Sequence, residues 1–295
     1  KITPYATSTP TGSQNGSIQY QIEGQDVQDF AYGTSSAKQI TLSFYAKTAS
    51  SNNGHQYTLQ LLKHSGASGS TNRYQHRAFT VTSSWQRFVM TFTTDTDNGI
   101  TNDNENRFRI VWHLASGPDD IESAKTTWVS GNPFRCTTGQ SNFMDNTSNE
   151  FYLTGVQLEV GDQATAFEHR SYAEELALCQ RYYFKMSADG DYASGGATMF
   201  AVAYNQDQYY ANGVLHFPTS MRTEPDALEQ SGTASHYRIQ YLSTNATCNG
   251  VPTFGGATLQ NARVVFVVAG GLTAGQGSLL RSASSSAYLA FSAEF

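Results

Sequence analysis

Short segments in which apolar and polar residues alternate are the feature of this sequence that most restricts its fold. In residues 39–48 every second side chain is apolar (Ile40, Leu42, Phe44 and Ala46) and the residues between them are mostly polar. Successive side chains of a β-strand point to opposite faces, so this pattern predicts an antiparallel strand with one buried face. Aromatic residues make up 13% of the chain, which also favours strands.

Turn-prone residues separate the alternating segments of the first half of the chain, as at Ser50-Ser-Asn-Asn-Gly54. The segments 74–81 and 86–93 are expected to pair with each other through the connection 82–85. About eight short strands with turns between them predict a jelly-roll β-sandwich. The predicted strands are residues 18–22, 39–48, 56–63, 74–81, 86–93, 107–114, 126–129 and 151–160.

A break after the strand at 151–160 predicts the end of the first domain. Gly161-Asp162 interrupts the alternation, and Ser171 with Glu174 three residues later forms a capping box, which predicts a helix over 171–185. The predicted domains are a jelly roll at 1–167, a connector with a short helix at 168–185, and a second domain at 186–295. One apolar stripe of the predicted helix, with spacings of four, three and four, contains Tyr172, Leu176, Cys179 and Tyr183.

The second domain also has a β-rich pattern, in which Gly-Gly and Asn-Gly pairs punctuate strand-like segments. Its length of about 110 residues is enough for a small β-sandwich. The fold class predicted for the whole chain is therefore all-β, with a smaller C-terminal sandwich after the short linking helix. The predicted strands are residues 197–204, 209–218, 236–242, 262–269 and 286–295.

Charge and hydropathy exclude two classes of partner. The formal net charge of −6 leaves no basic patch to neutralise phosphates, so nucleic-acid binding is not expected. The most apolar run, Val264–Val268, is far shorter than the ~18 residues that a membrane-spanning helix needs. Charged residues are only 14% of the chain, so neutral polar groups are expected to keep the surface hydrated.

The three cysteines, Cys136, Cys179 and Cys248, are odd in number and lack the CxxC spacing of a zinc site. They do not form a disulfide framework, although a single bridge from Cys136 to Cys248 stays open. Free thiols indicate folding in a reducing cytosol.

The histidines, serines and carboxylates of the sequence form no recognisable catalytic motif. Seven histidines show no HExxH motif, and no GxSxG elbow occurs. His169 lies between Glu168 and Arg170, where a hinge role is favoured over acid–base chemistry. The acidic stretches 95–105 and 119–122 do not place two carboxylates on one strand face, as glycoside hydrolysis requires. The chain is therefore not expected to be an enzyme.

The stretch 95–105 also resembles a calcium loop, but Gly99 occupies the fifth position, where an oxygen ligand belongs. A solvated turn is favoured there. A structural Ca²⁺ remains an alternative, and no metal or cofactor site is predicted.

A cluster of aromatic and amide side chains is the best candidate for ligand binding. Sugars stack on aromatic faces, while amides and carboxylates bond their hydroxyls. Asn212-Gly213 is expected to form a hairpin tip there. Similar clusters occur at 53–57, 128–134 and 236–241, although strand aromatics more often serve the core. The candidate residues are Gln206, Asp207, Tyr209, Tyr210 and Asn212.

Two motifs carry a resemblance to a known family, namely Leu153-Thr-Gly-Val-Gln-Leu-Glu-Val-Gly161 and the run from Phe167-Glu-His-Arg-Ser171 to Tyr183. The second continues as Glu174-Glu-Leu-Ala-Leu-Cys-Gln-Arg-Tyr-Tyr183, and residues 20–45 and 139–144 match as well. The chain resembles tail-fibre and related virion structural proteins of tailed bacteriophages over residues 13–183. In that family a carbohydrate-binding-module-like jelly roll is joined by such a junction to a variable C-terminal region.

The resemblance implies a virion protein assembled in the bacterial host cytoplasm, with further anchoring sequence upstream. It implies a homotrimer that contacts other virion proteins and binds a host cell-surface glycan or protein. The helix stripe is then expected to meet its copies around a threefold axis, and packing on its own domains is the alternative. A polysaccharide-depolymerase tailspike and a structural capsid-attached fibre or decoration protein remain alternative functions. The host, the receptor and tail or head attachment are left open.

Overall fold

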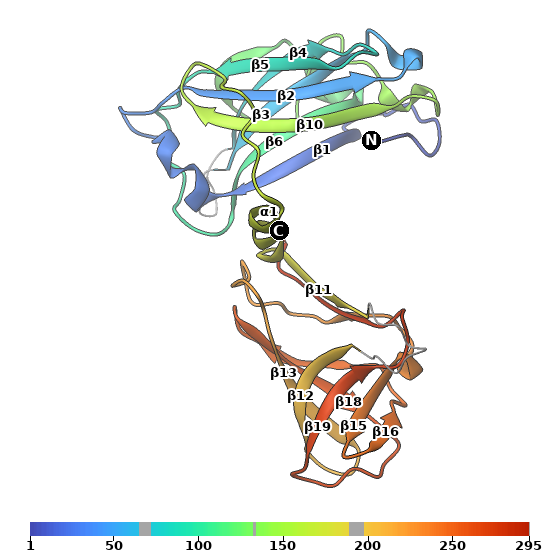
Figure 1. The fold of residues 1–295 in the computed structure, drawn as a ribbon. Coiled ribbons are helices and arrows are strands. Elements are labelled where there is room, and N and C mark those ends of the chain that lie inside the picture. The colour runs from blue at the N-terminus through green and yellow to red at the C-terminus, as the bar shows by residue number, and fades with distance from the viewer. Residues whose placement is uncertain (65–71, 132–133, 189–197, 295) are drawn as a thin grey trace. The chain divides into compact units, whose positions relative to one another are not determined.

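A computed structural model describes residues 1–64, 72–131, 134–188 and 198–294 of the chain. Contacts divide it into two compact units, Lys1–His169 and Arg170–Glu294. Strands dominate both units, which confirms the predicted all-β class (Figure 1). Within the described residues, α1 (Tyr172–Gln180) is the single α-helix. It is not long and apolar enough to cross a membrane.

Two antiparallel sheets form the sandwich of the first unit, and all eight predicted strands are present in it. The buried side chains between the sheets include Leu42, Phe44, Tyr57 and Trp112. The five-stranded sheet has the order β1 (Asn15–Glu23), β6 (Asn106–Ser116), β3 (Gln56–Lys63), β4 (Arg73–Thr80) and β8 (Lys125–Ser130). The three-stranded sheet has the order β10 (Phe151–Val160), β2 (Ile40–Thr48) and β5 (Gln86–Phe92).

The predicted pairing of segments 74–81 and 86–93 is wrong. β4 pairs with β3 and β8, whereas β5 pairs with β2 in the other sheet, where Phe88 lies opposite Phe44. Alternation fixes which face of a strand is buried but not which strand is its neighbour. The connection between β4 and β5 therefore passes from one sheet to the other.

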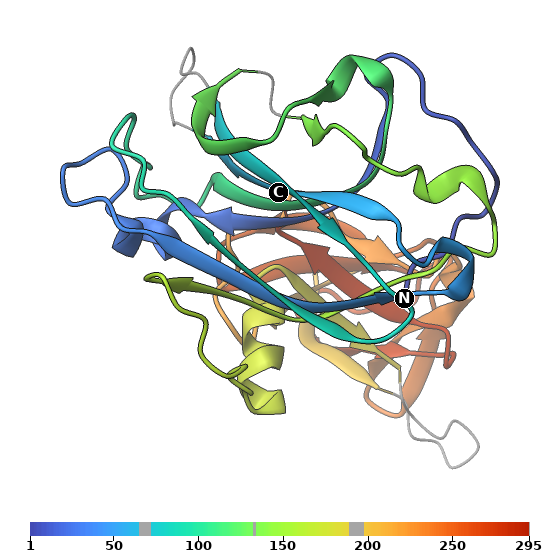
Figure 2. The same ribbon diagram turned by 90° about the horizontal axis from the view of Figure 1, so that it is seen from above.

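The outer face of the five-stranded sheet carries a buried polar cluster. Two short parallel strands, β7 (Ile121–Glu122) and β9 (Cys136–Thr137), lie next to it in the segment coloured green in Figure 2. The Glu122 carboxylate accepts from the Tyr74 hydroxyl at 2.7 Å and lies 3.1 Å from His76 Nε2. The hydroxyls of Thr58 and Thr137 are 2.9 Å apart. Polar side chains therefore attach this covering segment to the sheet.

The second unit is a sandwich of a seven-stranded and a three-stranded sheet around its own core. Phe200, Tyr237, Phe266 and Phe291 pack in this core. The large sheet has the order β16 (Thr244–Thr247), β15 (Tyr237–Tyr241), β19 (Gly277–Ser282), β12 (Met199–Asn205), β13 (Tyr210–His216), β18 (Asn261–Val267) and β17 (Thr253–Ala257). The small sheet has the order β11 (Tyr183–Ser187), β20 (Tyr288–Ser292) and β14 (Glu229–Gln230).

All five strand segments predicted for this unit contain a strand, although Ala197 and Phe295 at two of their ends lie outside the described residues. The predicted connector at 168–185 is not a separate part, because α1 and β11 belong to the second unit. The bridge from Cys136 to Cys248 that the sequence left open is not formed, because all three cysteines are free, and Cys136 and Cys248 are buried. Burial raises the pKa of the Cys136 thiol to about 11 and that of the Cys248 thiol to about 12.

Five short 3₁₀ segments complete the secondary structure of the described residues. They lie in the connections between strands. Their bounds are η1 (Gly24–Phe30), η2 (Ser50–Asn52), η3 (Pro118–Asp120), η4 (Phe143–Asp145) and η6 (Ala234–His236).

Candidate functional site

The predicted ligand-binding cluster lies at the hairpin between β12 and β13. The tip of this hairpin is at residues 206–209, where the Asp207 carboxylate accepts from the backbone N–H groups of Tyr209, at 2.7 Å, and Tyr210, at 2.9 Å. Such a side-chain bond to the backbone two residues later fixes a tight turn. Tyr209 and Tyr210 remain 41% and 42% exposed. The turn thus holds two aromatic rings in contact with solvent.

The predicted role of Asn212-Gly213 as the hairpin tip is wrong. Both residues lie inside β13, where Asn212 pairs with Tyr204 and Gly213 pairs with Ala203. The Asn212 side chain is only 4% exposed, and its amide donates to Gln206 Oε1 at 2.9 Å. The largely buried Asn212 therefore positions Gln206.

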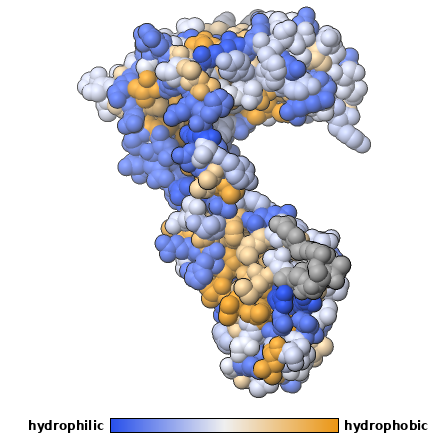
Figure 3. Space-filling model, viewed as in Figure 1, coloured by the Kyte–Doolittle hydropathy of each residue, from blue (hydrophilic) through white to orange (hydrophobic). Residues whose placement is uncertain are grey.

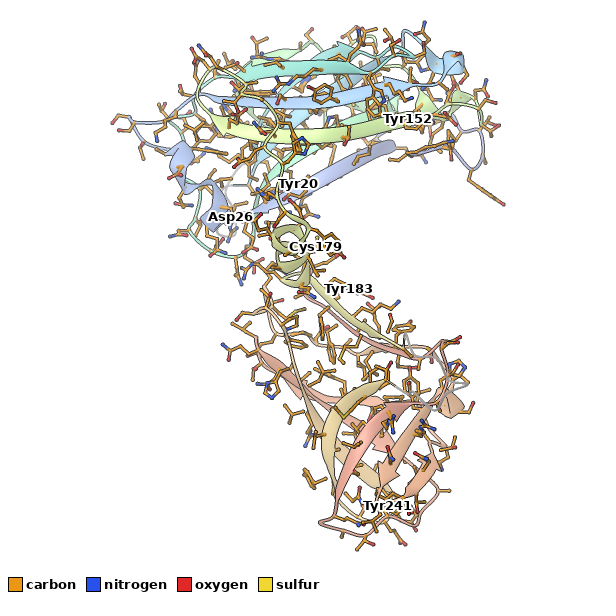
Figure 4. The ribbon with its side chains drawn as sticks, in the orientation of Figure 1. Tyr20, Asp26, Tyr152, Cys179, Tyr183 and Tyr241 are labelled. Carbon is orange, nitrogen blue, oxygen red and sulfur yellow. The ribbon has the colours of Figure 1, made fainter. Side chains whose placement is uncertain are left out.

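A second loop and the end of another strand lie beside this hairpin. The Val268 N–H donates to the carbonyl of Tyr209 at 3.0 Å, and a methyl group at Gly270 would lie 3.6 Å from the Tyr209 ring. The Tyr241 hydroxyl, at the end of β15, donates to the carbonyl of Gly271 at 3.2 Å. Figure 4 shows Tyr241 at this loop end of the second unit. The loop end, defined here as residues 206–210, 241–242 and 268–275, thus combines three tyrosines from two segments, Tyr209 and Tyr210 from the hairpin and Tyr241 from the end of β15.

Asn205, at the last position of β12, places a buried amide under the loop end. The side chain is fully buried, and neither Oδ1 nor Nδ2 has a hydrogen-bond partner among the described residues. An amide buried without partners costs about 1–3 kcal/mol.

A shallow groove of about 210 Å³ lies on the outer face of the large sheet, adjacent to the hairpin. Val202 and Tyr204 of β12 are 68% and 54% exposed, and Val214 of β13 is 51% exposed. Figure 3 shows apolar residues on the second unit where Figure 1 places β12 and β13. The groove is lined by Val202, Ala203, Tyr204, Asn212, Gly213, Val214 and Arg263.

Each of the other aromatic clusters named in the sequence analysis contains a buried aromatic ring. Tyr57, Trp128 and Tyr237 are buried in the two cores, so they are structural. Residues 132–133 of the 128–134 cluster lie outside the described part of the chain. Within the 236–241 cluster, Tyr241 alone reaches the loop end.

An exposed aromatic site in the first unit was missed by sequence reasoning. The Lys47 ammonium lies over two rings, 5.3 Å from the centre of Trp85 and 4.8 Å from that of Tyr152. Tyr152 lies directly opposite Lys47 in the sheet (Figure 4). The alternation in the sequence places Lys47 and Tyr45 on the solvent face of β2. This pattern could have indicated an exposed cation beside aromatic rings.

The predicted interface stripe is only partly helical. α1 ends at Gln180, so Tyr183 lies in β11, where its hydroxyl donates to Glu229 Oε2 at 3.2 Å. The chain leaves the helix early because Tyr183–Ser187 pairs with the last strand of the unit. Tyr172, Leu176 and Cys179 do share one face of α1, and none of its nine residues is buried. The capping box of Ser171 and Glu174 is confirmed.

The acidic loop 95–105 binds cations of the chain itself. The Asp95 carboxylate lies 2.6 Å from Lys63 Nζ and 2.9 Å from Arg73 Nε. Asp103 pairs with Arg107 at 2.6 Å, which lowers the pKa of Asp103. Asp97 Oδ2 also lies 3.2 Å from Arg73 Nη2, so three carboxylates of this loop, those of Asp95, Asp97 and Asp103, are already paired. His169, the predicted hinge residue, is exposed and contacts the edge of Phe167, with ring centres 4.9 Å apart.

In the described part of the chain, no three His, Cys, Asp or Glu side chains gather as metal ligands would. Comparisons with protein-family models, with curated proteins and with solved structures find no match to this chain.

Proposed function

We propose that this chain is a tail-fibre-like virion protein of a bacteriophage, and that it acts as a non-enzymatic adhesin for a host cell-surface glycan or protein. The loop end of the second unit is the observation that supports adhesion best. It exposes Tyr209 and Tyr210 on a turn fixed by Asp207, beside Tyr241. Rigid tyrosines presented by loops contact a partner with little loss of conformational entropy.

The adhesin role predicts that Tyr209→Ala weakens binding to host cells about tenfold, because truncation of a central tyrosine removes a large contact area. Binding of fluorescently labelled protein to a panel of bacterial strains, and to their purified surface polysaccharides, measures the effect. Tyr5→Ala is the matched control, since Tyr5 is fully exposed on the first unit. Equal binding by both variants would contradict the proposed site. Release of reducing sugar from the polysaccharides would instead favour a depolymerase.

The proposed adhesin is a homotrimer in which the face of α1 containing Tyr172, Leu176 and Cys179 meets its copies. The support is that this face is apolar while α1 buries none of its residues within one chain. A helix of nine residues is marginal on its own, and contact with copies would stabilise it.

The trimer predicts different outcomes for two exposed leucines of the same helix. Leu176 is 40% exposed on the proposed interface, and Leu178 is 47% exposed two residues later, on another face. We expect Leu176→Glu to yield monomers and Leu178→Glu to leave the trimer intact, since a buried carboxylate opposes association. Light scattering measures the mass against the 32.2 kDa of one chain. A monomeric wild-type protein at micromolar concentration would refute the trimer.

A further inference from the structure

Lys63, the last residue of β3, is buried together with its charge. Its side chain is fully inaccessible, and Nζ lies 2.6 Å from Asp95 Oδ2. The same ammonium donates to the backbone carbonyls of Asp97 and Asn98. One carboxylate oxygen and two carbonyl oxygens from a single turn therefore converge on one nitrogen.

The number of oxygens matches the chemistry of an ammonium group. A lysine ammonium has three N–H donors and no acceptor. The three oxygens of Asp95, Asp97 and Asn98 use all three donors, and the Tyr32 ring lies against the same group, with its centre 5.7 Å from Nζ. Burial lowers the pKa of Lys63, and the bond to Asp95 opposes this effect.

The turn itself is held in shape by contacts other than Lys63. Asp95 Oδ1 accepts from the Asp97 N–H at 3.1 Å, and the Asp95 carbonyl accepts from the Gly33 N–H at 2.8 Å. Arg73 Nε donates to Asp95 Oδ2 at 2.9 Å. The oxygens of the turn are thus positioned by groups that remain when the lysine is shortened.

Converging carboxylate and carbonyl oxygens are also how proteins bind Ca²⁺, but Ca²⁺ takes six to eight of them. We propose that the turn Asp95–Asn98 is a cation-binding turn whose cation is the chain's own Lys63 ammonium. We further propose that shortening Lys63 converts this turn into a site for a small primary alkylammonium ion.

Chemical rescue of Lys63→Ala in the full chain tests this proposal. The substitution removes the atoms from Cγ to Nζ, which n-propylammonium replaces. We expect the variant to lower the Tm of the first unit by about 10 °C, because Asp95 loses its buried partner. Millimolar n-propylammonium should restore most of this loss in a saturable manner. Tetramethylammonium, which has no N–H donor, should restore nothing at the same concentration.

Two further variants separate rescue from a general salt effect. The methionine side chain of Lys63→Met fills the space of the lysine methylenes and carries no N–H donor. This variant should therefore be destabilised, and n-propylammonium should not rescue it because the space is occupied. Lys38→Ala, at an exposed lysine, should keep the wild-type Tm in all solutions. If Lys63→Ala does not fold alone, the recovery of native fluorescence on refolding in n-propylammonium replaces the Tm measurement.

Three results would overturn the proposal. The first is the absence of rescue of Lys63→Ala in both formats, and the second is equal rescue by tetramethylammonium. The third is a loss of Tm when the wild-type protein is treated with EDTA, followed by recovery with Ca²⁺, because this would identify a divalent-ion site instead.

Discussion

Replacing Gly33 with alanine is expected to cost the first unit about 4 kcal/mol of unfolding free energy. Gly33 has φ of +79°, and a Cβ there would lie 2.2 Å from the backbone nitrogen of Gly99. The left-handed backbone costs an L-residue roughly 1–2 kcal/mol, and a forced shift of packed atoms adds about 1–3 kcal/mol. Backbone atoms of the neighbouring loop cannot rotate away as a flexible side chain does.

Gly54 offers a matched control for this prediction. It has φ of +86°, but a Cβ at this position would meet no atom within 4 Å. Gly54→Ala should therefore cost only about 1 kcal/mol, from the backbone conformation alone. Urea unfolding of both variants measures the difference. Similar losses for the two would mean that the loops carrying Gly33 and Gly99 do not contact each other as described.

Acidification from pH 6.5 to about 4 is expected to destabilise the first unit by roughly 3 kcal/mol through His113 alone. Burial lowers the pKa of His113 from 6.5 to about 4, and the nearby His76 adds to this effect. The neutral ring is bound, with Nε2 3.1 Å from Gln60 Oε1. In the unfolded state this histidine takes up a proton near pH 6.5. The unfolding free energy is therefore highest above pH 6.5, and it falls with pH until the histidine of the folded protein is also protonated, near pH 4. One pKa unit corresponds to about 1.4 kcal/mol.

A non-titrating replacement isolates the contribution of this histidine. His113→Gln keeps a polar group beside Gln60, so its unfolding free energy should fall less steeply between pH 6.5 and 4 than that of the wild type. His216→Gln, at an exposed position of the second unit, is the control. The comparison concerns slopes, so a constant loss of stability in His113→Gln does not affect it. Parallel pH curves for the wild type and His113→Gln would contradict the prediction.

Strand positions in the first unit were predictable from alternation, because its strands bury one face. Segment 39–48, for example, became β2 with Ile40, Leu42, Phe44 and Ala46 in the core. In the second unit, β19 was not predicted from the sequence. Ser278 and Ser282 take buried positions in this strand, so its buried and exposed faces do not differ clearly in polarity. The partner of β5 was also missed, because pairing depends on distant residues that the local pattern does not contain.

The candidate site was predictable in part. The aromatic–amide composition of 206–212 located the hairpin, but Asn212-Gly213 misplaced its tip, because the Asp207 carboxylate fixes the turn two residues before Tyr209. Tyr241 joins the loop end through Gly271, which is distant in sequence. The calcium-like loop illustrates the same limit, because its cation partner Lys63 belongs to another strand. Local sequence specifies turns and faces, while the meeting of segments follows from the whole fold.

The pairing of β11 with β20 has a consequence for how the protein is made on the ribosome. Phe184, near the start of the second unit, lies opposite Phe291 near its end. During translation, β11 therefore has no partner strand until β20, near the end of the unit, has been synthesised. The first unit lies wholly upstream and is free to fold during translation, whereas completion of the second follows synthesis of its last strand.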